Sequence, residues 1–584
     1  MPTRPLEGTH VRTWEAEPGR LAVDDIDRRS PGAGWVEPAG SSGPLTLVRL
    51  STGEVGGPAL EELVDSLGSP AELVLEVDPE DRERVASIRP DVTLIPGLRL
   101  TNSLGRRVER FVSLAPGRVG MYSCGPTVYS YQHLGNMRPY VFADTLKRVL
   151  RWRGYDVRHV INITDVGHLL ADADQGDDKV EEASRREGRS VAEITGHYTD
   201  VYWADLRSLH VTDPDAWPKA STFVTQMINF ATVLEERSFG YPLPEGLYFD
   251  TARQPAYGEL AGIGGQAQRE TGRVDAVAGK HSSSDFALWR TFTDGRERLM
   301  QWASPWGTGA PGWHLECSVM SMALLGDHFD VHTGGIDHRE LHHVNEIAQS
   351  EAYLADGRPW VRYWLHNEFL NFKGAKMAKS AGGTLRIADL VELGVHPLAF
   401  RYLLLGSHYG SQMDFTEKLA QASHVALKRL AARVRAAIGD DAPSGLDEPM
   451  TLLDALSGAT GLLRDRLLAL DAAVAEDLLT PTVLALINEW SRSPDELSPA
   501  EWAHLIRAVN TLTGLSLGVL AADDFAPPLP GSVDVAWVEE RLAARDAARA
   551  ERDWAAADRL RDELAAVGLR IEDTPEGSHW SVVG

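Results

Sequence analysis

Residues 119–165 read VGMYSCGPTVYSYQHLGNMRPYVFADTLKRVLRWRGYDVRHVINITD, and this segment decides the fold. It predicts a strand over 119–123, a Gly-Pro turn, a helix over about 137–153 and a second strand over 156–163. A strand, a helix and a strand at this spacing form a βαβ unit, which belongs to a parallel sheet. Ligands of such sheets bind beyond the carboxyl ends of the strands, where residues 124–127 and 162–165 fall.

Outward from this segment the chain of 584 residues divides into several units, as its length leads us to expect. We predict a small α/β N-terminal extension over 1–96, a larger α/β region over 97–415, an all-α region over 416–525, and a C-terminal helix with a small tail over 526–584. The extension offers no recognisable chemistry. We expect it to be an interaction or dimer-contact module, or packing alone.

Each unit has its own predicted elements. In the extension, residues 1–40 predict a loop, and the remainder predicts strands at 45–50 and 72–77 and short helices at 58–67 and 79–88. Further along, apolar residues spaced by three and four predict helices over 418–438, 450–474, 512–522 and about 534–567. The last of these ends at Gly568 and is followed by a short strand over 569–571.

Cysteine content and charge limit the class of protein. The chain has two cysteines, Cys124 and Cys317, which are too few for the disulfide framework of a secreted fold. The sequence has no apolar run near the ~20 residues that span a bilayer and no secretory signal at its start, so we expect a cytoplasmic protein. The net charge of −26 opposes indiscriminate nucleic-acid binding, but a local basic stripe can still bind a folded RNA.

Two segments suit phosphate groups. Residues 133–136, His-Leu-Gly-Asn, open the predicted helix, and a helix N-terminus offers free N–H groups and the positive end of the helix dipole. Gly135 lets a ligand approach the backbone, and His133 can donate to a phosphate oxygen. Residues 373–380 hold three lysines, including Lys376 and Lys379, that can trap an anion. Alone, a segment like 133–136 is more often structural, whereas the lysine segment is equally typical of a solvated basic loop.

Both cysteines belong to a candidate metal site. His342 and Glu346 are four residues apart, so on a helix they share a face. With Cys124 and Cys317 they form a set of two thiolates, an imidazole and a carboxylate, all of which zinc accepts in tetrahedral geometry. Each residue alone is more typical of a buried core position. Together they explain both cysteines of the chain.

Six motifs, in one order, resemble the cysteinyl-tRNA synthetase family. They are Cys-Gly-Pro-Thr at 124–127, His-Leu-Gly-Asn at 133–136, Trp-His-Leu-Glu-Cys at 313–317, Thr-Gly-Gly-Ile-Asp at 333–337, His-His-Val-Asn-Glu-Ile-Ala-Gln at 342–349 and Lys-Met-Ala-Lys-Ser at 376–380. The resemblance covers about residues 97–584 and includes the tail at 572–580.

The resemblance implies a class I Rossmann-type parallel-sheet catalytic domain, followed by an all-α tRNA-binding region. It implies a cysteine–tRNA ligase that activates L-cysteine with ATP and Mg²⁺ as a cysteinyl-adenylate and transfers it to tRNA(Cys). It implies one Zn²⁺ held by Cys124, Cys317, His342 and Glu346. The implied catalytic residues are His133, Asn136, Lys376 and Lys379. The implied ATP and adenylate contacts are Gly125, Thr127, Gly135, Asn162, Thr164, Trp313, Gly335, Asp337 and Lys379. We expect a monomer.

The chain also departs from the family pattern. Ala378 stands in the lysine loop where the family usually has Ser, and residues 1–96 match nothing in the family. Two alternatives therefore stay open: a ligase of the same fold that joins cysteine to a small amine, as the mycothiol ligase does, and a non-catalytic paralogue. The helical region after 416 and the C-terminal tail favour a tRNA partner over a small amine.

The last predicted helix carries six arginines with two possible roles. They form an RNA-facing stripe, or they pair with acidic residues of the same helix. The six are Arg541, Arg545, Arg549, Arg552, Arg559 and Arg561. Trp554 and Trp580 are candidates to stack on unpaired bases.

Overall fold

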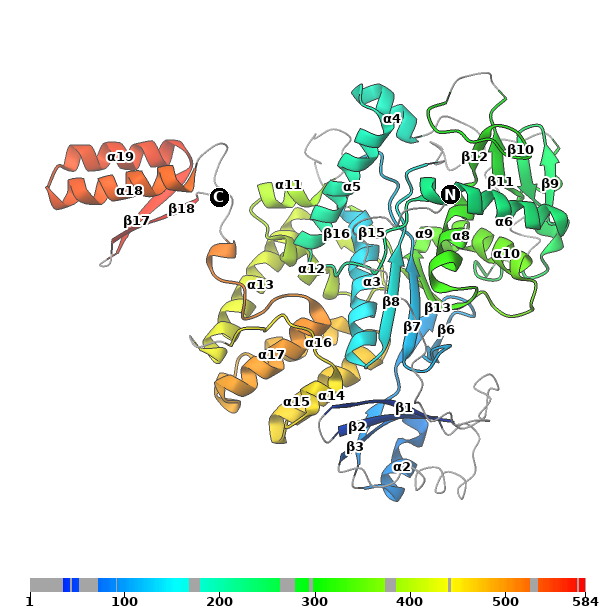
Figure 1. Ribbon diagram of the computed structural model, residues 1–584. Helices are drawn as coiled ribbons and strands as arrows, with labels where there is room; N and C mark the ends of the chain where they lie inside the picture. The colour runs from blue at the N-terminus through cyan, green and yellow to red at the C-terminus, as the bar shows by residue number, and fades with distance from the viewer. Residues whose placement is uncertain are drawn as a thin grey trace, which may run out of the picture.

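Four parallel strands form the centre of the catalytic region in the computed structural model (Figure 1). Their order is β14-β13-β7-β8, with bounds Val361–Asn367, Phe329–Gly335, Arg118–Ser123 and Asp156–Ile161. The structure describes residues 35–42, 45–51, 72–90, 92–166, 179–262, 279–293, 298–372, 385–439, 443–525, 534–574 and 577–582. The predicted βαβ unit is confirmed: helix α3 (Leu134–Trp152) connects β7 to β8, and these two strands pair in parallel.

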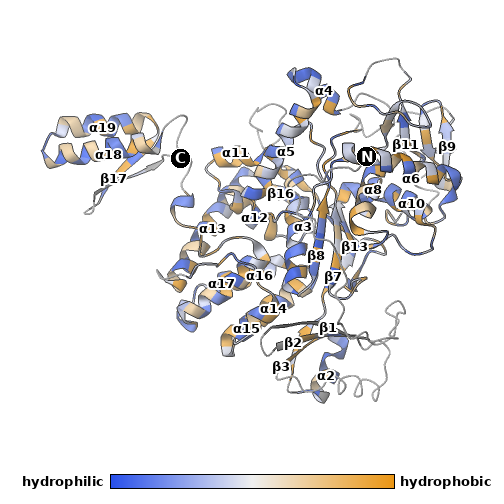
Figure 2. Cartoon of the chain, in the orientation of Figure 1, coloured by the Kyte–Doolittle hydropathy of each residue, from blue (hydrophilic) through white to orange (hydrophobic). Residues whose placement is uncertain are grey.

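The two faces of this sheet are covered by different helices. Successive strand residues alternate between faces: Met121 joins a core with α3 and the C-terminal helices, and Tyr122 joins a second core with α6, α8 and α10. These helices span Val224–Glu236, Trp313–Leu325 and His342–Leu354. Figure 2 shows apolar residues on the central strands and on the inward faces of the helices.

Further elements surround the carboxyl edge of the central sheet, where the predicted site residues lie. An antiparallel sheet of order β12-β11-β10-β9 is inserted before β13, with bounds Gly309–Pro311, Phe286–Thr291, Gly246–Phe249 and Gly240–Leu243. Helices α4 (Lys179–Glu187), α5 (Val191–Ser208) and α9 (Ile336–Arg339) complete this side. Two short ribbons flank the central sheet, β5 (Arg99–Asn102) with β6 (Arg107–Arg110) and β15 (Leu370–Phe372) with β16 (Met413–Phe415).

The N-terminal extension is an α/β unit, as predicted. Its sheet has the order β1-β2-β3-β4, with bounds Trp35–Ser42, Leu45–Ser51, Glu72–Val77 and Thr93–Pro96. The predicted helix at 79–88 is present as a short 3-10 turn followed by α2 (Arg82–Ile88). The prediction of a loop over 1–40 was wrong for residues 35–40, which pair with β2. The helix predicted at 58–67 lies outside the described residues.

The helical region was predicted in outline, but one of its predicted helices is divided and another is absent. It contains α11 (Ile387–Glu392), α12 (Pro397–Leu405), α13 (Glu417–Ile438), α14 (Leu452–Leu456), α15 (Gly461–Ala475), α16 (Thr480–Trp490) and α17 (Pro499–Thr513). The helix predicted over 450–474 is two helices, because Gly458 has φ +74° between them. The helix predicted over 512–522 is absent, since α17 ends where Gly514 takes a left-handed φ of +63°.

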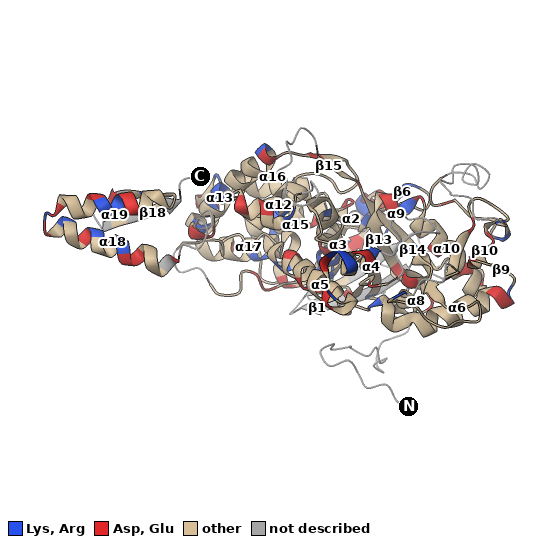
Figure 3. Cartoon of the chain, turned by 90° about the horizontal axis from the view of Figure 1, so that it is seen from above, with Lys and Arg blue, Asp and Glu red and all other residues tan. Residues whose placement is uncertain are grey.

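The C-terminal unit is a helical hairpin with a small β-hairpin, and it stands apart from the helical region in Figures 1 and 3. The single helix predicted over 534–567 is two helices, α18 (Val535–Ala550) and α19 (Trp554–Ala566). Arg552 has φ +62° at the break, and the carboxylate of Asp553 caps the second helix. The strand predicted at 569–571 belongs to a hairpin of β17 (Leu569–Thr574) and β18 (Gly577–Val582). In the part of the chain that the structure describes, no helix combines the length and apolarity that a bilayer crossing requires.

Candidate active site and metal centre

A cavity of about 560 Å³ opens at the carboxyl edge of the central sheet. The loops that follow β7, β8, β13 and β14 all reach it, as the topology of a parallel sheet predicts. The predicted site residues in its lining are Cys124, Gly125, Thr127, His133, Gly135, Asn136, Asn162, Thr164, Trp313, Cys317, Gly335, Asp337 and His342. Glu346 lies buried behind His342. Lys376 and Lys379 lie outside the described residues.

The loop after β7 is fixed by the loop after β8. The backbone N–H of Gly125 donates to Oδ1 of Asn162 at 2.8 Å, and the N–H of Thr164 donates to the carbonyl of Pro126 at 3.0 Å. A Cβ at position 125 would lie 1.5 Å from the carbonyl oxygen of Asn162, so glycine is required there by this close backbone approach. Asn162 also donates to the hydroxyl of Thr164 at 3.0 Å, and that hydroxyl donates to the buried Glu316 at 3.2 Å. One wall of the cavity is therefore held rigidly.

His133 and Asn136 cap the first turn of α3. The backbone N–H of Asn136 donates to Nδ1 of His133 at 3.3 Å, and the N–H of His133 donates to Oδ1 of Asn136 at 3.1 Å. This capping box explains why α3 begins at Leu134, three residues before its predicted start. Because Nδ1 accepts a hydrogen bond, Nε2 carries the proton of the neutral imidazole and is available to an anion. Burial lowers the pKa of His133, which favours this neutral form.

Four side chains from three segments converge below the cavity. Cys124 follows β7, Cys317 is on α8, and His342 and Glu346 are on α10. One candidate ligand atom from each of the four lies within 4.8 Å of all the others. Nε2 of His342 is 3.0 Å from Oε1 of Glu346, as their i, i+4 spacing predicts. The convergence expected from the sequence is thus present.

The chemistry of this group fits a divalent cation. Burial raises the pKa of the Cys124 thiol and of the Glu346 carboxyl well above their usual ranges, so their anionic forms need a compensating positive charge. Among the described residues, none donates a hydrogen bond of good geometry to Oε1 of Glu346. Two sulfurs, one imidazole and one carboxylate within one coordination sphere are the donors that zinc accepts.

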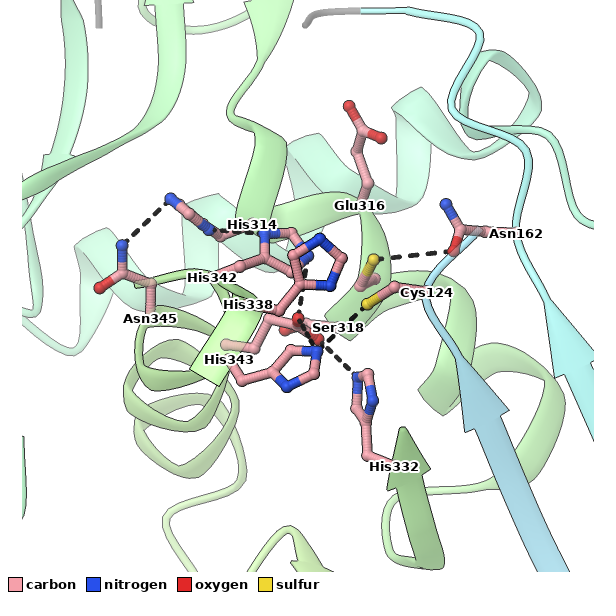
Figure 4. A network of polar contacts seen from close by, with 12 residues as sticks. Cys124, Asn162, His314, Glu316, Ser318, His332, His338, His342, His343 and Asn345 are labelled. Carbon is pink, nitrogen blue, oxygen red and sulfur yellow. Dashed lines mark hydrogen bonds and ion pairs between the residues drawn. The ribbon is translucent and has the colours of Figure 1, made fainter. Parts of the chain in front are cut away.

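A second group shares two of these residues. Cys124, His332, His343 and Glu346 also place one ligand atom each within 4.8 Å of one another. Nε2 of His343 is 3.2 Å from Sγ of Cys124, and Nε2 of His332 is 3.0 Å from Oε2 of Glu346. Figure 4 shows His343 and Cys124 pointing toward each other. Burial lowers the pKa of His332 to about 3 and that of His343 well below its usual value, so both imidazoles are neutral and able to coordinate.

Sequence reasoning missed three features of this site. His332 lies on β13, whose residues are all buried, so no alternation marked the face on which it lies. His343 was passed over because its neighbour His342 has the i, i+4 spacing to Glu346. Lys179, at the start of α4, lines the cavity and lies 5.7 Å from the Tyr129 ring centre. Nothing in the sequence places Lys179 in the cavity lining, because this lysine reaches the lining only through the fold.

The arginines of the C-terminal unit are largely paired within that unit. Arg545 and Arg549 both contact the carboxylate of Asp573 on β17, and Arg541 reaches Glu563 on α19 at 3.5 Å. Figure 3 shows the two signs of charge mixed along α18 and α19. The predicted pairing with acidic residues of the same helix holds for Arg541, which also lies 3.5 Å from Glu540, and for Arg561, which lies 3.2 Å from Asp558. For Arg545 and Arg549 the ion-pair partner is on a strand instead. Nε1 of Trp580 donates to Glu539 at 2.8 Å, whereas Trp554 is 60% exposed.

Comparison with known proteins agrees with this geometry. Residues 110–425 match a family model described as the class I (C) tRNA synthetase catalytic domain, and residues 536–580 match one described as the cysteinyl-tRNA ligase anticodon binding domain. The fold and the site thus define a class I aminoacyl-tRNA synthetase.

The relatives narrow this class. A cysteine–tRNA ligase from Zymomonas mobilis is 43% identical over 82% of this chain and 97% of its own length, and one from Burkholderia lata is 43% identical over 82% and 96%. The chain belongs to the cysteine–tRNA ligase family. A solved structure of methionyl-tRNA synthetase from Mycobacterium tuberculosis, bound by methionyl-adenylate, is 16% identical with a TM-score of 0.44, covering 75% of this chain and 96% of that one.

Proposed function

We propose that this chain joins L-cysteine to tRNA(Cys), using one zinc ion held by Cys124, Cys317, His342 and Glu346. The observation that carries the proposal is the convergence of these four side chains below a cavity whose rim is the N-terminus of α3. Bound zinc would supply a soft Lewis acid that holds the substrate thiol as a thiolate. The family membership of the chain supports the same substrate.

The metal addresses a problem of selectivity. Serine differs from cysteine by one atom, and an apolar pocket separates such small differences by only ~1–3 kcal/mol. We therefore propose that the side chains around the position of the substrate thiol hold the metal ion and exclude other amino acids such as serine. Trp313 packs over His342 with ring centres 4.2 Å apart, which fixes the imidazole in its orientation. His332 and His343 contact Glu346 and Cys124 and orient those two ligands.

In the first step, a carboxylate oxygen of cysteine attacks the α-phosphorus of ATP. A new P–O bond forms, the bond to the bridging oxygen breaks, and pyrophosphate leaves; Mg²⁺ bound with ATP would offset the negative charge of the phosphates. His133 and Asn136 are proposed to bind phosphate oxygens at the N-terminus of α3, where Gly135 permits close approach. Lys376 and Lys379 are proposed to close over the phosphates from the opposite side. These groups act by positioning and by stabilising negative charge.

The cysteinyl-adenylate is proposed to lie across the carboxyl edge of the sheet. Its contacts come from Gly125, Thr127, Asn162, Thr164, Trp313, Gly335 and Asp337, with Asp337 at the ribose. In the second step, a ribose hydroxyl of the terminal adenosine of the tRNA attacks the cysteinyl carbonyl, and AMP leaves.

The test separates the two steps. Cysteine-dependent exchange of pyrophosphate into ATP reports the first step, and charging of purified tRNA reports the second. We expect both reactions, each at least 1,000-fold slower with serine at equal concentration. Exchange without charging, together with a cysteinyl-amine product, would identify the small-amine ligase instead. Absence of adenylate formation by zinc-loaded protein would identify a non-catalytic paralogue.

A further inference from the structure

The N-terminal extension packs into the main core of the molecule. Its described residues match neither family model, because the first matching segment begins at residue 110 and the second at residue 536. Nevertheless Leu47, Val74 and Ile95 are fully buried in the same hydrophobic cluster as residues of α3 and α15. Figure 1 shows the extension beneath the central sheet and beside α14 and α15. It therefore touches the catalytic and the helical regions at once.

Glu76 on β3 is the centre of this contact. Its carboxylate has no exposed surface, and three guanidinium groups approach it. Arg49 on β2 lies at 3.3 Å, Arg110 on β6 at 3.0 Å, and Arg153, which follows α3, at 3.3 Å. Only Arg49 belongs to the extension. The other two arise from the catalytic region, so Glu76 crosses the boundary between the two units.

Arg153 carries the network onward to the helical region. Its Nη2 lies 2.8 Å from Oδ2 of Asp471 on α15, and its Nη1 donates to the carbonyl of Pro96 at 2.8 Å. Asp471 also accepts a hydrogen bond from Nε1 of Trp152 at 3.0 Å. Arg153 and Asp471 have no exposed surface. One guanidinium thus joins the extension, the end of α3 and the helical region.

One contact joins the extension to α15 directly, whereas the Asp471 contact joins α15 to Arg153 of the catalytic region. Nη2 of Arg464 donates to the hydroxyl of Thr93 on β4 at 2.8 Å. This contact and the Asp471 contact lie about two turns apart on α15, so the helix is held at two points along its length. Two points fix the direction of a helix, whereas one would leave it free to pivot.

These contacts lie at the amino end of the sheet. Arg153 lies three residues before β8 begins at Asp156, and Arg110 ends β6, in the segment that leads to the start of β7 at Arg118. The cavity is at the opposite, carboxyl end, ~20 Å away for strands of six residues. A change in this network can therefore alter the orientation of the helical region without reaching the adenylate site.

We propose that the described strands β1 to β4 of the N-terminal extension are an internal bracket that fixes the helical region against the catalytic sheet, with Glu76 as the positioning residue, so that tRNA charging depends on the bracket and cysteine activation does not. The tRNA part rests on the proposed function. The mechanical part, which is the fixed direction of α15, stands independently of it.

The test compares Glu76→Gln with Glu80→Gln, a matched change at an exposed glutamate of the same unit. In Glu76→Gln we expect kcat of pyrophosphate exchange, and its KM for ATP and KM for cysteine, to stay within twofold of the unaltered protein. The KM for tRNA in charging should rise at least fivefold. Hydrogen exchange should become at least tenfold faster in the peptides of α15 while those of β13 stay unchanged. Glu80→Gln should change none of these quantities.

Three results would overturn the bracket: unchanged α15 exchange, an unchanged KM for tRNA in an enzyme that charges, or a parallel loss of both reactions. If the unaltered chain charges no tRNA, the proposed function fails, and the α15 exchange rate alone still decides the mechanical part. If Glu76→Gln does not fold, Thr93→Val replaces it, since this change removes only the hydroxyl that Arg464 contacts. We expect at least threefold faster exchange in α15 for Thr93→Val, and no change would refute the bracket.

Discussion

His342 and His343 are neighbours on α10, yet their contacts assign them different roles. His342 lies beside Glu346 in the group that contains both cysteines, whereas His343 contacts Cys124 and, through Nδ1, Nε2 of His366 at 2.8 Å. We expect His342→Asn to abolish stoichiometric zinc binding, because it removes a ligand. We expect His343→Asn to weaken zinc binding by ~10–100-fold, as is usual when a residue that orients a metal ligand is replaced. Metal analysis after dialysis against chelators of graded affinity measures both.

Met320→Leu is the matched control on the other ligand-bearing helix. Met320 is fully buried on α8, and the substitution conserves its volume, so zinc content should not change. The opposite ranking of the two histidine variants would place the metal in the group of Cys124, His332, His343 and Glu346.

Gly125 is the residue that backbone geometry constrains most sharply. A methyl group there would collide with the carbonyl of Asn162, which is backbone and cannot rotate aside. We expect Gly125→Ala to lower kcat/KM for cysteine-dependent exchange at least 100-fold, because displaced contacts of this kind misplace reacting groups. Zinc content should stay near one per chain.

Gly196 on α5 provides the contrast for this prediction. Among the described atoms, none lies within 4 Å of the Cβ that alanine would add there. Gly196→Ala should leave kcat/KM unchanged and raise the free energy of unfolding by ~0.5–1 kcal/mol, since alanine favours a helix interior over glycine. Equal activity of the two variants would show that the loop after β7 tolerates displacement.

At the scale of elements, the sequence predicted what depends on local pattern. The βαβ unit and the helix of α13 follow from periodicity, and the edge of the sheet that carries the site follows from strand direction. Helix ends were predicted less well, because they depend on caps and on single residues with positive φ. Arg552, which divides the predicted C-terminal helix, is not a residue that usually adopts φ +62°. His332 and Lys179 reach the site only through tertiary packing.

The C-terminal unit exposes one tryptophan and partly buries another. Trp580 packs with Val538, Leu564 and Leu569, whereas Trp554 is 60% exposed at the start of α19. We expect Trp554→Ala to raise KM for tRNA ~5–100-fold, the range that follows from ~1–3 kcal/mol for base stacking. Its thermal midpoint and its pyrophosphate exchange should not change.

Trp580→Ala should act differently, through stability. It removes a partly buried ring and a hydrogen bond to Glu539, so the C-terminal unit should lose protection from proteolysis. If Trp554→Ala leaves KM for tRNA unchanged, the exposed ring has no role in binding.

For the whole molecule, α3 is the element that joins the cavity to the helical region. Its first turn forms the rim of the cavity, and its buried Asp144 forms an ion pair with Arg401 of α12. Nε of Arg401 in turn donates to the carbonyl of Thr513 on α17 at 2.6 Å. The sequence indicated separate catalytic and helical units with a boundary near 416. The buried arginines that join them could not be predicted, because their partners lie more than a hundred residues away.

Asp477, between α15 and α16, is another junction of this kind, and we expect it to make the stability of the protein depend on pH. Its carboxylate accepts a hydrogen bond from the N–H of Thr101 on β5 at 2.8 Å and lies 3.4 Å from Nε2 of His408, which follows α12. The hydrogen bond to Asp477 raises the pKa of His408 above its ordinary value, against the burial that lowers it. The folded protein therefore binds this proton more tightly than the unfolded chain does.

A raised pKa in the folded state stabilises the protein only while the group is protonated. The contribution of His408 is fully present below the ordinary histidine pKa of about 6.5, and it is lost as the pH rises through the higher pKa of the folded state. We expect the free energy of unfolding of unaltered protein to exceed that of His408→Gln by more at low pH than at high pH. Urea midpoints measured at intervals between about pH 6 and pH 9 provide the comparison. Asp477→Asn should weaken the same pH dependence, because it removes the carboxylate that raises the pKa most and leaves the backbone carbonyl that Nε2 of His408 contacts at 2.7 Å. A difference between unaltered protein and His408→Gln that is constant with pH would mean that His408 contributes by packing alone, and that the junction at Asp477 does not sense protons.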